Sequence, residues 1–471
     1  MRFRFAISAL LVFLCCRMAS AAPPSIPGEY KGEWQYTLAS GSKGYAVALL
    51  PKNAPPVADW KAAPTRGELL VRFDADDPPT KNIFNAERNI YERPQREIAI
   101  YWDGVEVARR LSPGPLDGGP GATTRFQVAF VTGGAEVTVS AGTTTTYDHY
   151  FVPGVMPFVA RLDVSDPAAI SHVALMGTQH ARLNPQPIHV RAIDTMLISN
   201  GKPGGTSWAD FPTDTERIGR VVCTLTLAKT ANGIDPWDRI GNVYVYDDKG
   251  ERFELLRFIT PYRKAYQWQQ NVTDLLPLLT GKRKVQIDCT TYSQGWLASV
   301  DFAFYPGPAA RHPYKVVNLW NTVALIGQES KPFASFVPPM TVPIDPKADA
   351  AAVRMLVTGH GEDPNTDNAA EFISLWRKLS VGGATYQNTL WKEDNYLNPC
   401  RPQGGTWKFD RAGWGPGTVV DPWVVDVTKD VKAGTNATFD YTIQPYVNKT
   451  PNNGDPARYV VGAQLILYRR G

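Results

Sequence analysis

Cysteine, helical periodicity and clustered charge are all scarce in this chain of 471 residues. Two of the five cysteines, Cys15 and Cys16, lie in an apolar N-terminal segment, which leaves Cys223, Cys289 and Cys400. An odd number leaves at least one thiol unpaired within a monomer, and whether the other two form a disulfide stays open. No two of the three are close in sequence, which argues against a zinc site.

Charge and hydropathy exclude further classes of protein. The net charge is only +4 and no long run of Lys and Arg occurs, so nothing points to nucleic acid as a partner. Arg2 and Arg4 precede a short apolar run and a small-residue site at Ala19–Ala21, which predicts an export signal over residues 1–21. We therefore expect a secreted or periplasmic protein with no membrane segment after cleavage; an uncleaved anchor is the alternative.

Strand patterns and turn residues are abundant. Gly and Pro number 39 each, and short alternating segments such as Glu97–Trp102 and Asn242–Tyr246 recur between turns. Helix-period patterning is confined to Val272–Leu279. Many short strands with frequent turns predict an all-β protein built from sandwiches or jelly rolls.

The chain is expected to hold three folded parts. Residues 22–205 predict a β-rich N-terminal domain that ends in a glycine-rich linker at Gly201–Gly205. Residues 206–313 and residues 314–471 predict two further β domains, since each has its own set of apolar strands.

Four short motifs concentrate groups that can do chemistry. The sequence has Asp235–Arg239, Thr358–Glu362, Glu371–Phe372 and Asp410–Trp414. Carboxylates can move protons, guanidinium groups can bind oxygen-rich groups, and indoles can stack on sugar faces. The plainer interpretation of the first motif is a turn-capping aspartate beside a surface ion pair.

A family resemblance favours the chemical interpretation. The order and spacing of Asp235–Arg239, Arg257–Tyr262, Glu371–Phe372 and Asp410–Trp414 resemble those of the bacterial peptide-N-glycosidase F family. The resemblance covers about residues 206–471. It implies two adjacent eight-stranded antiparallel jelly rolls with a site between them, and a monomer that uses no metal or organic cofactor.

The resemblance also implies an activity. Members of the family are amidases that hydrolyse the bond between an asparagine side chain and the first N-acetylglucosamine of an N-linked glycan. The glycan leaves as a glycosylamine and aspartate remains, so N-glycoproteins or glycopeptides are the expected substrates. Copper monooxygenases also pair jelly rolls, but residues 206–471 hold only His312 and His360 as histidine ligands.

Matching motif by motif assigns the site. Asp238 and Glu371 are expected to be catalytic, with Asp238 as the general base. The expected substrate-binding residues are Asp235, Arg239, Arg411, Trp414, Phe372 and His360.

The chain also departs from the family pattern. Phe372 and His360 stand where the family has indoles, and Thr290 stands where it has a glutamate. A hydroxyl cannot carry charge near neutral pH, so a glycan-binding protein with impaired catalysis is the alternative.

Overall fold

The computed structural model describes the strands between residues 28 and 179 and most of the chain from residue 187 to residue 470. The gaps in this second part are residues 308, 310, 366–369, 394, 396, 397, 399, 401, 402 and 453. The expected export signal lies outside the described residues. The chain divides into an N-terminal unit, residues 1–82 and 93–183, and a C-terminal unit, residues 83–92 and 184–471.

The N-terminal unit contains two five-stranded antiparallel sheets, ordered β10-β9-β8-β1-β12 and β11-β2-β3-β6-β7. The predicted strand Glu97–Trp102 is confirmed as β6. The other strands are β1 (Gly28–Thr37), β2 (Tyr45–Pro51), β3 (Leu69–Asp74), β7 (Val105–Leu111), β8 (Thr123–Val131), β9 (Gly134–Ala141), β10 (Tyr147–Pro153), β11 (Ala160–Val164) and β12 (Ile170–Gln179). The hairpin of β4 (Ile83–Asn85) and β5 (Ile90–Glu92) belongs to the C-terminal unit.

The first sandwich of the C-terminal unit pairs two four-stranded sheets, ordered β13-β20-β15-β18 and β14-β19-β16-β17. Its elements are β13 (Ile188–Ile198), β14 (Gly204–Phe211), β15 (Ile218–Ala228), β16 (Ile240–Tyr246), β17 (Arg252–Ile259), β18 (Tyr266–Asn271), the 3₁₀-helix η3 (Thr273–Leu278), β19 (Gly281–Cys289) and β20 (Trp296–Pro306). The expected helical segment is therefore present as η3.

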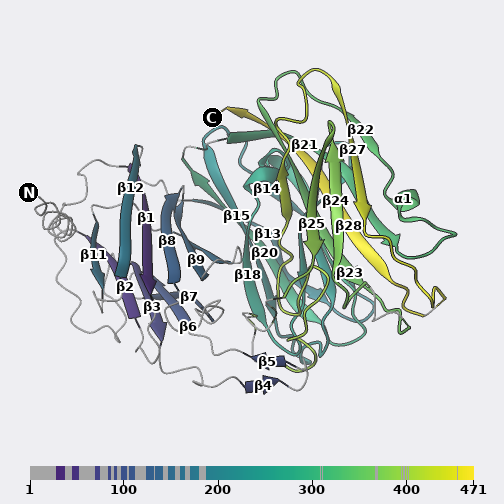
Figure 1. The fold of residues 1–471 in the computed structure, drawn as a ribbon, viewed down its shortest axis with the longest axis horizontal. Coiled ribbons are helices and arrows are strands. Elements are labelled where there is room, and N and C mark those ends of the chain that lie inside the picture. Colours follow the sequence, from purple (N-terminus) through teal and green to yellow (C-terminus); the bar gives the residue numbers. More distant parts are fainter. Residues whose placement is uncertain are drawn as a thin grey trace, which may run out of the picture. The chain divides into compact units, whose positions relative to one another are not determined.

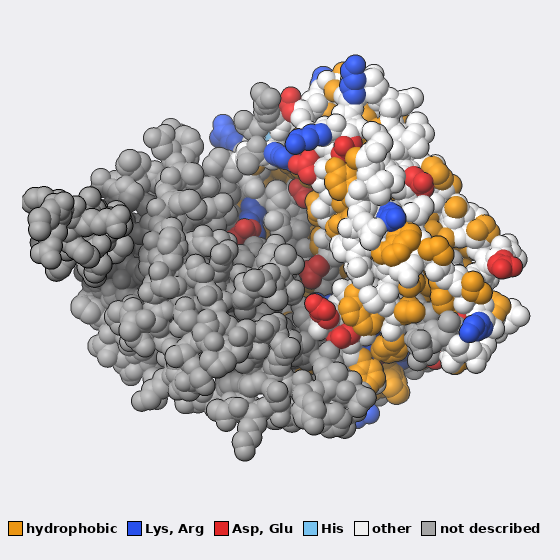
Figure 2. Space-filling model, in the orientation of Figure 1, with side chains coloured by type: hydrophobic (Ala, Val, Ile, Leu, Met, Phe, Trp, Pro, Cys, Tyr) orange, Lys and Arg blue, Asp and Glu red, His pale blue; other side chains and the backbone are white. Residues whose placement is uncertain are grey.

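The second sandwich repeats this plan with sheets ordered β21-β28-β23-β26 and β22-β27-β24-β25. Its elements are β21 (Arg311–Leu325), α1 (Phe333–Phe336), β22 (Met340–Pro343), β23 (Ala350–His360), β24 (Leu375–Val381), β25 (Ala384–Leu390), β26 (Trp423–Asp426), β27 (Asn436–Ile443) and β28 (Arg458–Arg470). Acidic and basic side chains are intermixed on the face of this unit that Figure 2 shows. No helix in the described parts is long and apolar enough to cross a membrane.

Both sandwiches have the strand order of a jelly roll. Counted along the chain, one sheet of each holds the first, eighth, third and sixth strands, and the other holds the second, seventh, fourth and fifth. First and last strands are thus paired, as β13 with β20 and β21 with β28. The predicted all-β fold with two eight-stranded antiparallel jelly rolls, preceded by a β-rich region, is confirmed.

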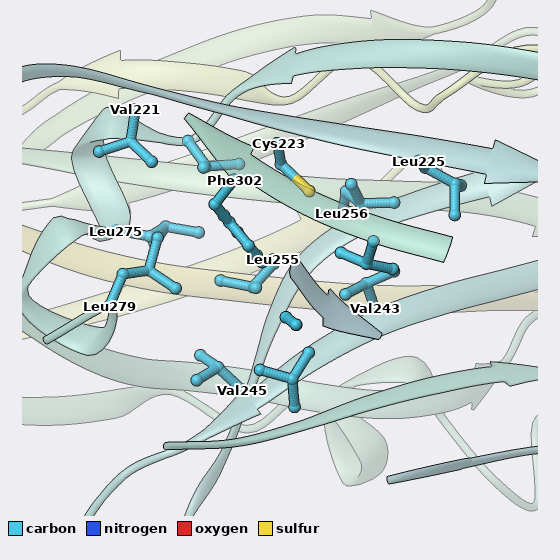
Figure 3. Packing of buried hydrophobic residues seen from close by; sticks show 14 of the residues in the cluster. Val221, Cys223, Leu225, Val243, Val245, Leu255, Leu256, Leu275, Leu279 and Phe302 are labelled. Atoms are coloured by element: carbon cyan, nitrogen blue, oxygen red, sulfur yellow. The ribbon is translucent and has the colours of Figure 1, made fainter. Parts of the chain in front are cut away.

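Alternation along the strands builds the core of the first sandwich. Val221, Cys223 and Leu225 lie on one side of β15 because every second side chain of a strand points the same way. They are fully buried in one cluster with Val243 and Phe302 (Figure 3). Burying one such valine or leucine side chain contributes about 2 kcal/mol. The three cysteines of the described residues are buried and form no disulfide.

The expected linker at Gly201–Gly205 is part of the first sandwich. Gly201 lies in the turn after β13, with a φ of 74°, and Gly204 begins β14. A Cβ on Gly204 would lie 1.9 Å from the carbonyl oxygen of Ile287 on β19, so glycine is needed for strand pairing. The described fold therefore extends the first sandwich upstream of Thr206, to β13.

A hydrogen-bonded seam joins the two sandwiches. The end of β17 pairs with residues 417–420, through bonds from Ile259 N to Thr418 O (2.9 Å) and from Val420 N to Arg257 O (2.8 Å). The buried Arg257 guanidinium also donates to Thr358 Oγ1 at 2.9 Å and to the carbonyl of Val460 at 2.7 Å. Figure 1 shows the teal strands of the first sandwich against the green and yellow strands of the second. The seam fixes how loops from the two sandwiches meet.

Candidate active site

Asp235 holds the loop between β15 and β16 in place. Its fully buried carboxylate accepts hydrogen bonds from the Trp237 backbone N–H (2.7 Å), the Ser293 hydroxyl (2.6 Å) and the Thr291 hydroxyl. Arg239 Nε lies 3.5 Å from the same carboxylate. These donors occupy both carboxylate oxygens, so Asp235 supports the loop and does not face a ligand, in contrast to its expected substrate-binding role.

Asp238 lies in the same loop and is half-buried. The loop is fixed beside it, because Arg239 N donates to Thr260 Oγ1 at 2.7 Å and Thr260 in turn donates to the carbonyl of Trp237 at 2.9 Å. Burial raises the pKa of the Asp238 carboxyl, while a hydrogen bond from Tyr262 and the charges of Arg411 and Arg239 act in the opposite direction. Asp238 is therefore a partly buried carboxyl with a hydroxyl donor and two nearby cations.

Glu371 provides a second carboxyl, from the segment between β23 and β24. Its Oε1 accepts a hydrogen bond from Arg411 Nε at 3.2 Å. Burial raises its pKa to about 7; the positive charge and hydrogen bond of Arg411 oppose this, and the charge of Asp238 adds to it. Asp238 thus acts on Glu371, and both carboxyls feel the charge of Arg411.

The residue before Glu371 has an unusual backbone. Ala370 is fully buried and has a φ of 116°, a conformation that side chains other than glycine rarely adopt. Such a conformation costs about 1–3 kcal/mol and is often found at functional sites. Its carbonyl lies so close to Gly359 that a Cβ there would approach to 1.9 Å. The position of Glu371 is therefore fixed by a strained and tightly packed segment.

Arg411 is completely buried and its donors are engaged. Besides the bond to Glu371, its guanidinium donates to the carbonyl of Thr406 (2.8 Å), the carbonyl of Phe409 (2.9 Å) and Thr406 Oγ1 (2.7 Å). In this structure Arg411 is bonded within the protein, and its direct binding to a substrate stays a prediction. Arg411 holds Glu371 and the loop between β25 and β26.

Trp414 and His360 are also buried supports. The Trp414 ring lies 4.8 Å from the Arg411 guanidinium, and its Nε1 donates to the carbonyl of Gly359 at 2.7 Å. His360 stacks on Trp414 at 5.0 Å between ring centroids. Burial lowers the pKa of His360 well below 6.5, which keeps it neutral. Since Trp414 is 4% exposed and His360 is 5% exposed, neither offers a face to substrate as expected.

Phe372 lies between the buried residues of the site and the surface. Its half-buried ring lies 5.0 Å from the Arg411 guanidinium and meets the Phe409 ring edge-on at 6.1 Å. The residue thus contacts the buried arginine and retains some exposed surface.

The exposed aromatic rings of the site are Trp237 and Tyr292. Trp237 is 56% exposed and Tyr292 is 75% exposed, and the Arg239 guanidinium lies 5.5 Å from the Tyr292 ring. Neither residue was among the substrate-binding residues expected from the motifs. Their positions in loops after strands were the available signal. Thr290, which is also exposed, lies two residues before Tyr292 in the chain.

The arrangement defines a class of protein before any comparison. It is an all-β double jelly roll whose loops bring together two carboxyl groups, one buried arginine and two exposed aromatic rings. Among the described residues, no group of three His, Cys, Asp or Glu side chains is placed to hold a metal ion. The donors present are suited to proton transfer and to binding a neutral polar ligand with apolar faces.

The comparisons with known proteins identify the family. Residues 330–465 match the family described as "Peptide-N-glycosidase F, C terminal". The chain is 28% identical over 282 residues to peptide-N(4)-(N-acetyl-beta-D-glucosaminyl)asparagine amidase F of Elizabethkingia miricola, which covers 54% of this chain and 76% of that protein. Both matches support a relationship to the peptide-N-glycosidase F family, and the relative in Elizabethkingia miricola is an amidase by name.

Solved structures agree on the fold. Recombinant peptide:N-glycanase F matches 61% of this chain and 97% of its own, with a TM-score of 0.55 and 22% identity. The glycosylasparaginase PNGase F from Flavobacterium meningosepticum matches with the same TM-score, identity and coverage. At this identity the match supports the double jelly-roll fold alone.

Proposed function

We propose that this protein hydrolyses the amide bond between an asparagine side chain and the first N-acetylglucosamine of an N-linked glycan. The observation that carries the proposal is the pair of carboxyls, Asp238 and Glu371, that share the charge of Arg411 in different surroundings. The family relationship supports the reaction class, and the relative in Elizabethkingia miricola is named for this activity. N-glycoproteins or glycopeptides would be the substrates, outside the cytoplasm, for a monomer without a cofactor.

Asp238 is the proposed general base. Its carboxylate takes a proton from water as the water oxygen bonds to the amide carbon, and later returns the proton to the leaving nitrogen when the C–N bond breaks. The products are aspartate and a glycosylamine. The hydrogen bond from Tyr262 and the charges of Arg239 and Arg411 favour the ionised form that a base requires.

Glu371 is the proposed donor to the sugar. Because burial raises its pKa to about 7, a large share of Glu371 is protonated near neutral pH and can donate a hydrogen bond. Two carboxyls whose surroundings differ in this way can act as base and as donor in the same site. The hydrogen bond from Arg411 Nε orients the Glu371 carboxyl.

Arg239 is the cation proposed to stabilise the negative oxygen of the intermediate. We considered Arg239 and Arg411 for this task, and Arg411 is fully buried with its donors engaged. Arg239 is 22% exposed, so part of its side chain can meet a ligand, while its Nε is buried 3.5 Å from the Asp235 carboxylate. Donors aimed at a developing charge are commonly the largest electrostatic contribution to such reactions.

Trp237 and Tyr292 are proposed to receive the first sugar rings. Both rings are exposed, and both lie in loops next to the carboxyl pair. Aromatic faces pack against the C–H faces of sugars while the sugar hydroxyls stay hydrated. This replaces the role that Trp414 and His360 were expected to have.

The direct test is glycan release. Purified protein is incubated with a denatured N-glycoprotein, and peptides are analysed by mass spectrometry for Asn converted to Asp at the glycosylation site. Conversion by the native protein and none by Asp238→Asn supports the proposal. Intact glycopeptides after long incubation over a broad pH range would contradict it.

One observation favours a second candidate, a glycan-binding protein with impaired catalysis. Thr290 is exposed two residues before Tyr292, at the position where the family resemblance places a glutamate, and its hydroxyl cannot carry charge. This candidate requires binding of free glycans, measured by calorimetry, without any release in the assay above. Rapid release would eliminate it.

A further inference from the structure

Arg377 occupies a core position of the second sandwich. Leu375, Arg377 and Leu379 lie on the same side of β24, because every second side chain of a strand points the same way, and all three are buried. Leu375 and Leu379 belong to the apolar core of this sandwich. The strand therefore carries a guanidinium group inward, at a position flanked by two core leucines.

Arg377 differs from the buried Arg257 in having no carboxylate beside it. Arg257 lies 2.8 Å from Glu254. In the part of the chain that the structure describes, no acidic group is among those that act on the Arg377 charge, and its Nε has no hydrogen-bond partner. The guanidinium lies 4.7 Å from the Trp423 ring, whose face attracts a cation but leaves the in-plane N–H donors unused. A buried charge that nothing offsets costs on the order of several kcal/mol.

The Tyr441 hydroxyl is a second donor in the same part of the core. The register of β24 and β27 pairs Leu379 with Tyr441, so Arg377 and Tyr441 are diagonal neighbours on the inward face. Tyr441 is 1% exposed, and its Oη has no hydrogen-bond partner among the described residues. Burial raises the pKa of Tyr441 to about 12, while the nearby Arg377 guanidinium opposes this, so the hydroxyl keeps its proton. Even if its oxygen accepts from the guanidinium, the hydroxyl proton has no acceptor there.

Tyr459 brings a third donor from the facing sheet. It lies on β28 and is 0% exposed, and its Oη likewise has no partner within the described ranges. The Phe333 ring lies 5.8 Å from the Tyr441 ring and 6.4 Å from the Tyr459 ring, between ring centroids. Both tyrosine rings pack on the same phenylalanine, and both hydroxyls act on the charge of Arg377. The three polar groups therefore lie together.

We propose that Arg377, Tyr441 and Tyr459 form an internal binding site for a small monovalent anion of the size of chloride. Each of the three groups has an N–H or O–H to donate, and the guanidinium adds a positive charge. A water molecule can accept such hydrogen bonds, but it leaves the buried charge unbalanced. A halide ion accepts the hydrogen bonds and also balances the charge.

The surroundings favour a single-atom ion. The three polar atoms are buried, and the rings of Phe333 and Trp320 pack against Tyr441. Phosphate or a carboxylate would bring more oxygen acceptors than three donors can satisfy. None of the three residues belongs to the candidate active site, so this inference goes beyond the proposed function. Its test needs no glycan and no enzymatic activity.

Thermal unfolding of the full chain tests the site. The unfolding temperature is measured in sodium chloride and in sodium gluconate at equal ionic strength, so that the screening of charges is the same in both. We expect the unfolding temperature to be about 3 °C higher in chloride, because a ligand that binds only the folded state stabilises that state. Equal unfolding temperatures in the two salts overturn the proposal.

Substitutions assign the effect to these residues. Arg377→Met keeps a long side chain and removes the charge, so it should abolish the difference between the two salts. Tyr441→Phe and Tyr459→Phe each remove one donor and should weaken chloride binding about tenfold, as measured by the chloride dependence of the unfolding temperature. Tyr386→Phe in β25 is the control and should respond as the native protein does, because the Tyr386 hydroxyl already donates to Asp430. A chloride response that survives Arg377→Met overturns the proposal.

Bromide locates the ion directly and decides the question even if a variant fails to fold. Crystals of the native protein grown in sodium bromide are measured at the absorption edge of bromine. We expect an anomalous difference peak within hydrogen-bond distance of Arg377 Nε and of the Tyr441 and Tyr459 hydroxyls. If no anomalous signal is present at this position, it holds water or nothing, and the proposal is wrong.

Discussion

The two sandwiches share one topology and contribute different things to the site. From the first come the loop of Trp237 and Asp238 and the loop of Tyr292, which offer exposed rings and an accessible carboxyl. From the second come Arg411 and Trp414, which are buried, with Glu371 at their edge. One sandwich thus presents groups to a ligand while the other supports them, although both have arginine and tryptophan in their motifs.

The largest effect is expected from shortening the chain at its N-terminus, and it depends on the residue at which the shortened protein begins. A protein that begins near Thr206 lacks β13, which is paired with β20 along most of its length. A protein that begins at Asn184 keeps this strand. We expect the longer form to be soluble with a cooperative unfolding transition, and the shorter form to be insoluble or unfolded, as measured by circular dichroism and gel filtration. A stable shorter form would show that the first sandwich does not need the strand that corresponds to β21 in the second.

Asp238→Asn tests the first sandwich, which presents groups to a ligand. Loss of the general base should lower kcat about a thousandfold and leave the unfolding temperature unchanged or higher, because the amide keeps the shape and removes a partly buried charge. Glycan release from a labelled glycopeptide measures the rate. Asp214→Asn, an exposed aspartate of the same sandwich, is the control. A rate near the native value would remove Asp238 from the mechanism.

Arg411→Leu tests the second sandwich, which supports these groups. Arg239→Leu in the first sandwich is the matched variant. Removing a buried cation leaves Glu371 and two carbonyls without their donor, which should cost about 3 kcal/mol of unfolding free energy. Arg239→Leu should lower the unfolding free energy less than Arg411→Leu does. It should also lower kcat more for each kcal/mol of unfolding free energy that is lost. Urea denaturation and initial rates provide the two measurements. If the loss of kcat per kcal/mol of lost unfolding free energy were equal in the two variants, the two sandwiches would not differ in presenting and supporting roles.

Glu371→Gln tests the carboxyl at the edge. Burial raises the pKa of Glu371 from its usual 4.5 to about 7. Between these values the unfolded chain is ionised and the folded protein is not, so native stability falls as pH rises from about 5 to about 7 and the loss persists above. Glutamine does not titrate, so the variant should be more stable than the native protein by about 3 kcal/mol at pH 8 and by almost nothing at pH 4. Equal stability differences at both pH values would contradict the raised pKa.

Trp237→Ala and Tyr292→Ala should have the smallest effects. Each removes an exposed ring, so we expect the KM for a glycopeptide to rise about fivefold with the unfolding temperature nearly constant. Trp414→Ala provides the contrast, because loss of a buried indole destabilises by about 3 kcal/mol. Should the exposed rings prove more important for stability than Trp414, the assignment of presenting and supporting sides would be reversed.

The sequence predicted the architecture well because its signals are local. Alternation of apolar residues marks strands such as Glu97–Trp102, and turn residues separate them. Gly201–Gly205 failed as a linker for a physical reason. Glycine occurs both in flexible segments and where backbones approach closely, and only the partner strand β19 shows that Gly204 is the second case.

The motifs predicted which segments form the site but not which of their side chains are buried. The motifs located Asp238 and Glu371 in one site, because motif order fixes which loops meet. They assigned Arg411 and Trp414 to the cavity wall, since a guanidinium group and an indole have the same chemistry whether they face a ligand or a core. Which face they occupy depends on the seam and on partners such as Thr406, which are distant in sequence from the first motif and carry no signal of their own.

The seam between Ile259 and Thr418 has a consequence for biosynthesis. A ribosome makes Asp238 long before it makes residues 417–420, so the emerging chain holds its base without Arg411 or the loop that carries Thr406. Until the last third of the chain has been synthesised and has folded against β17, the candidate site is incomplete. The site is thereby assembled late, as a property of the finished polypeptide.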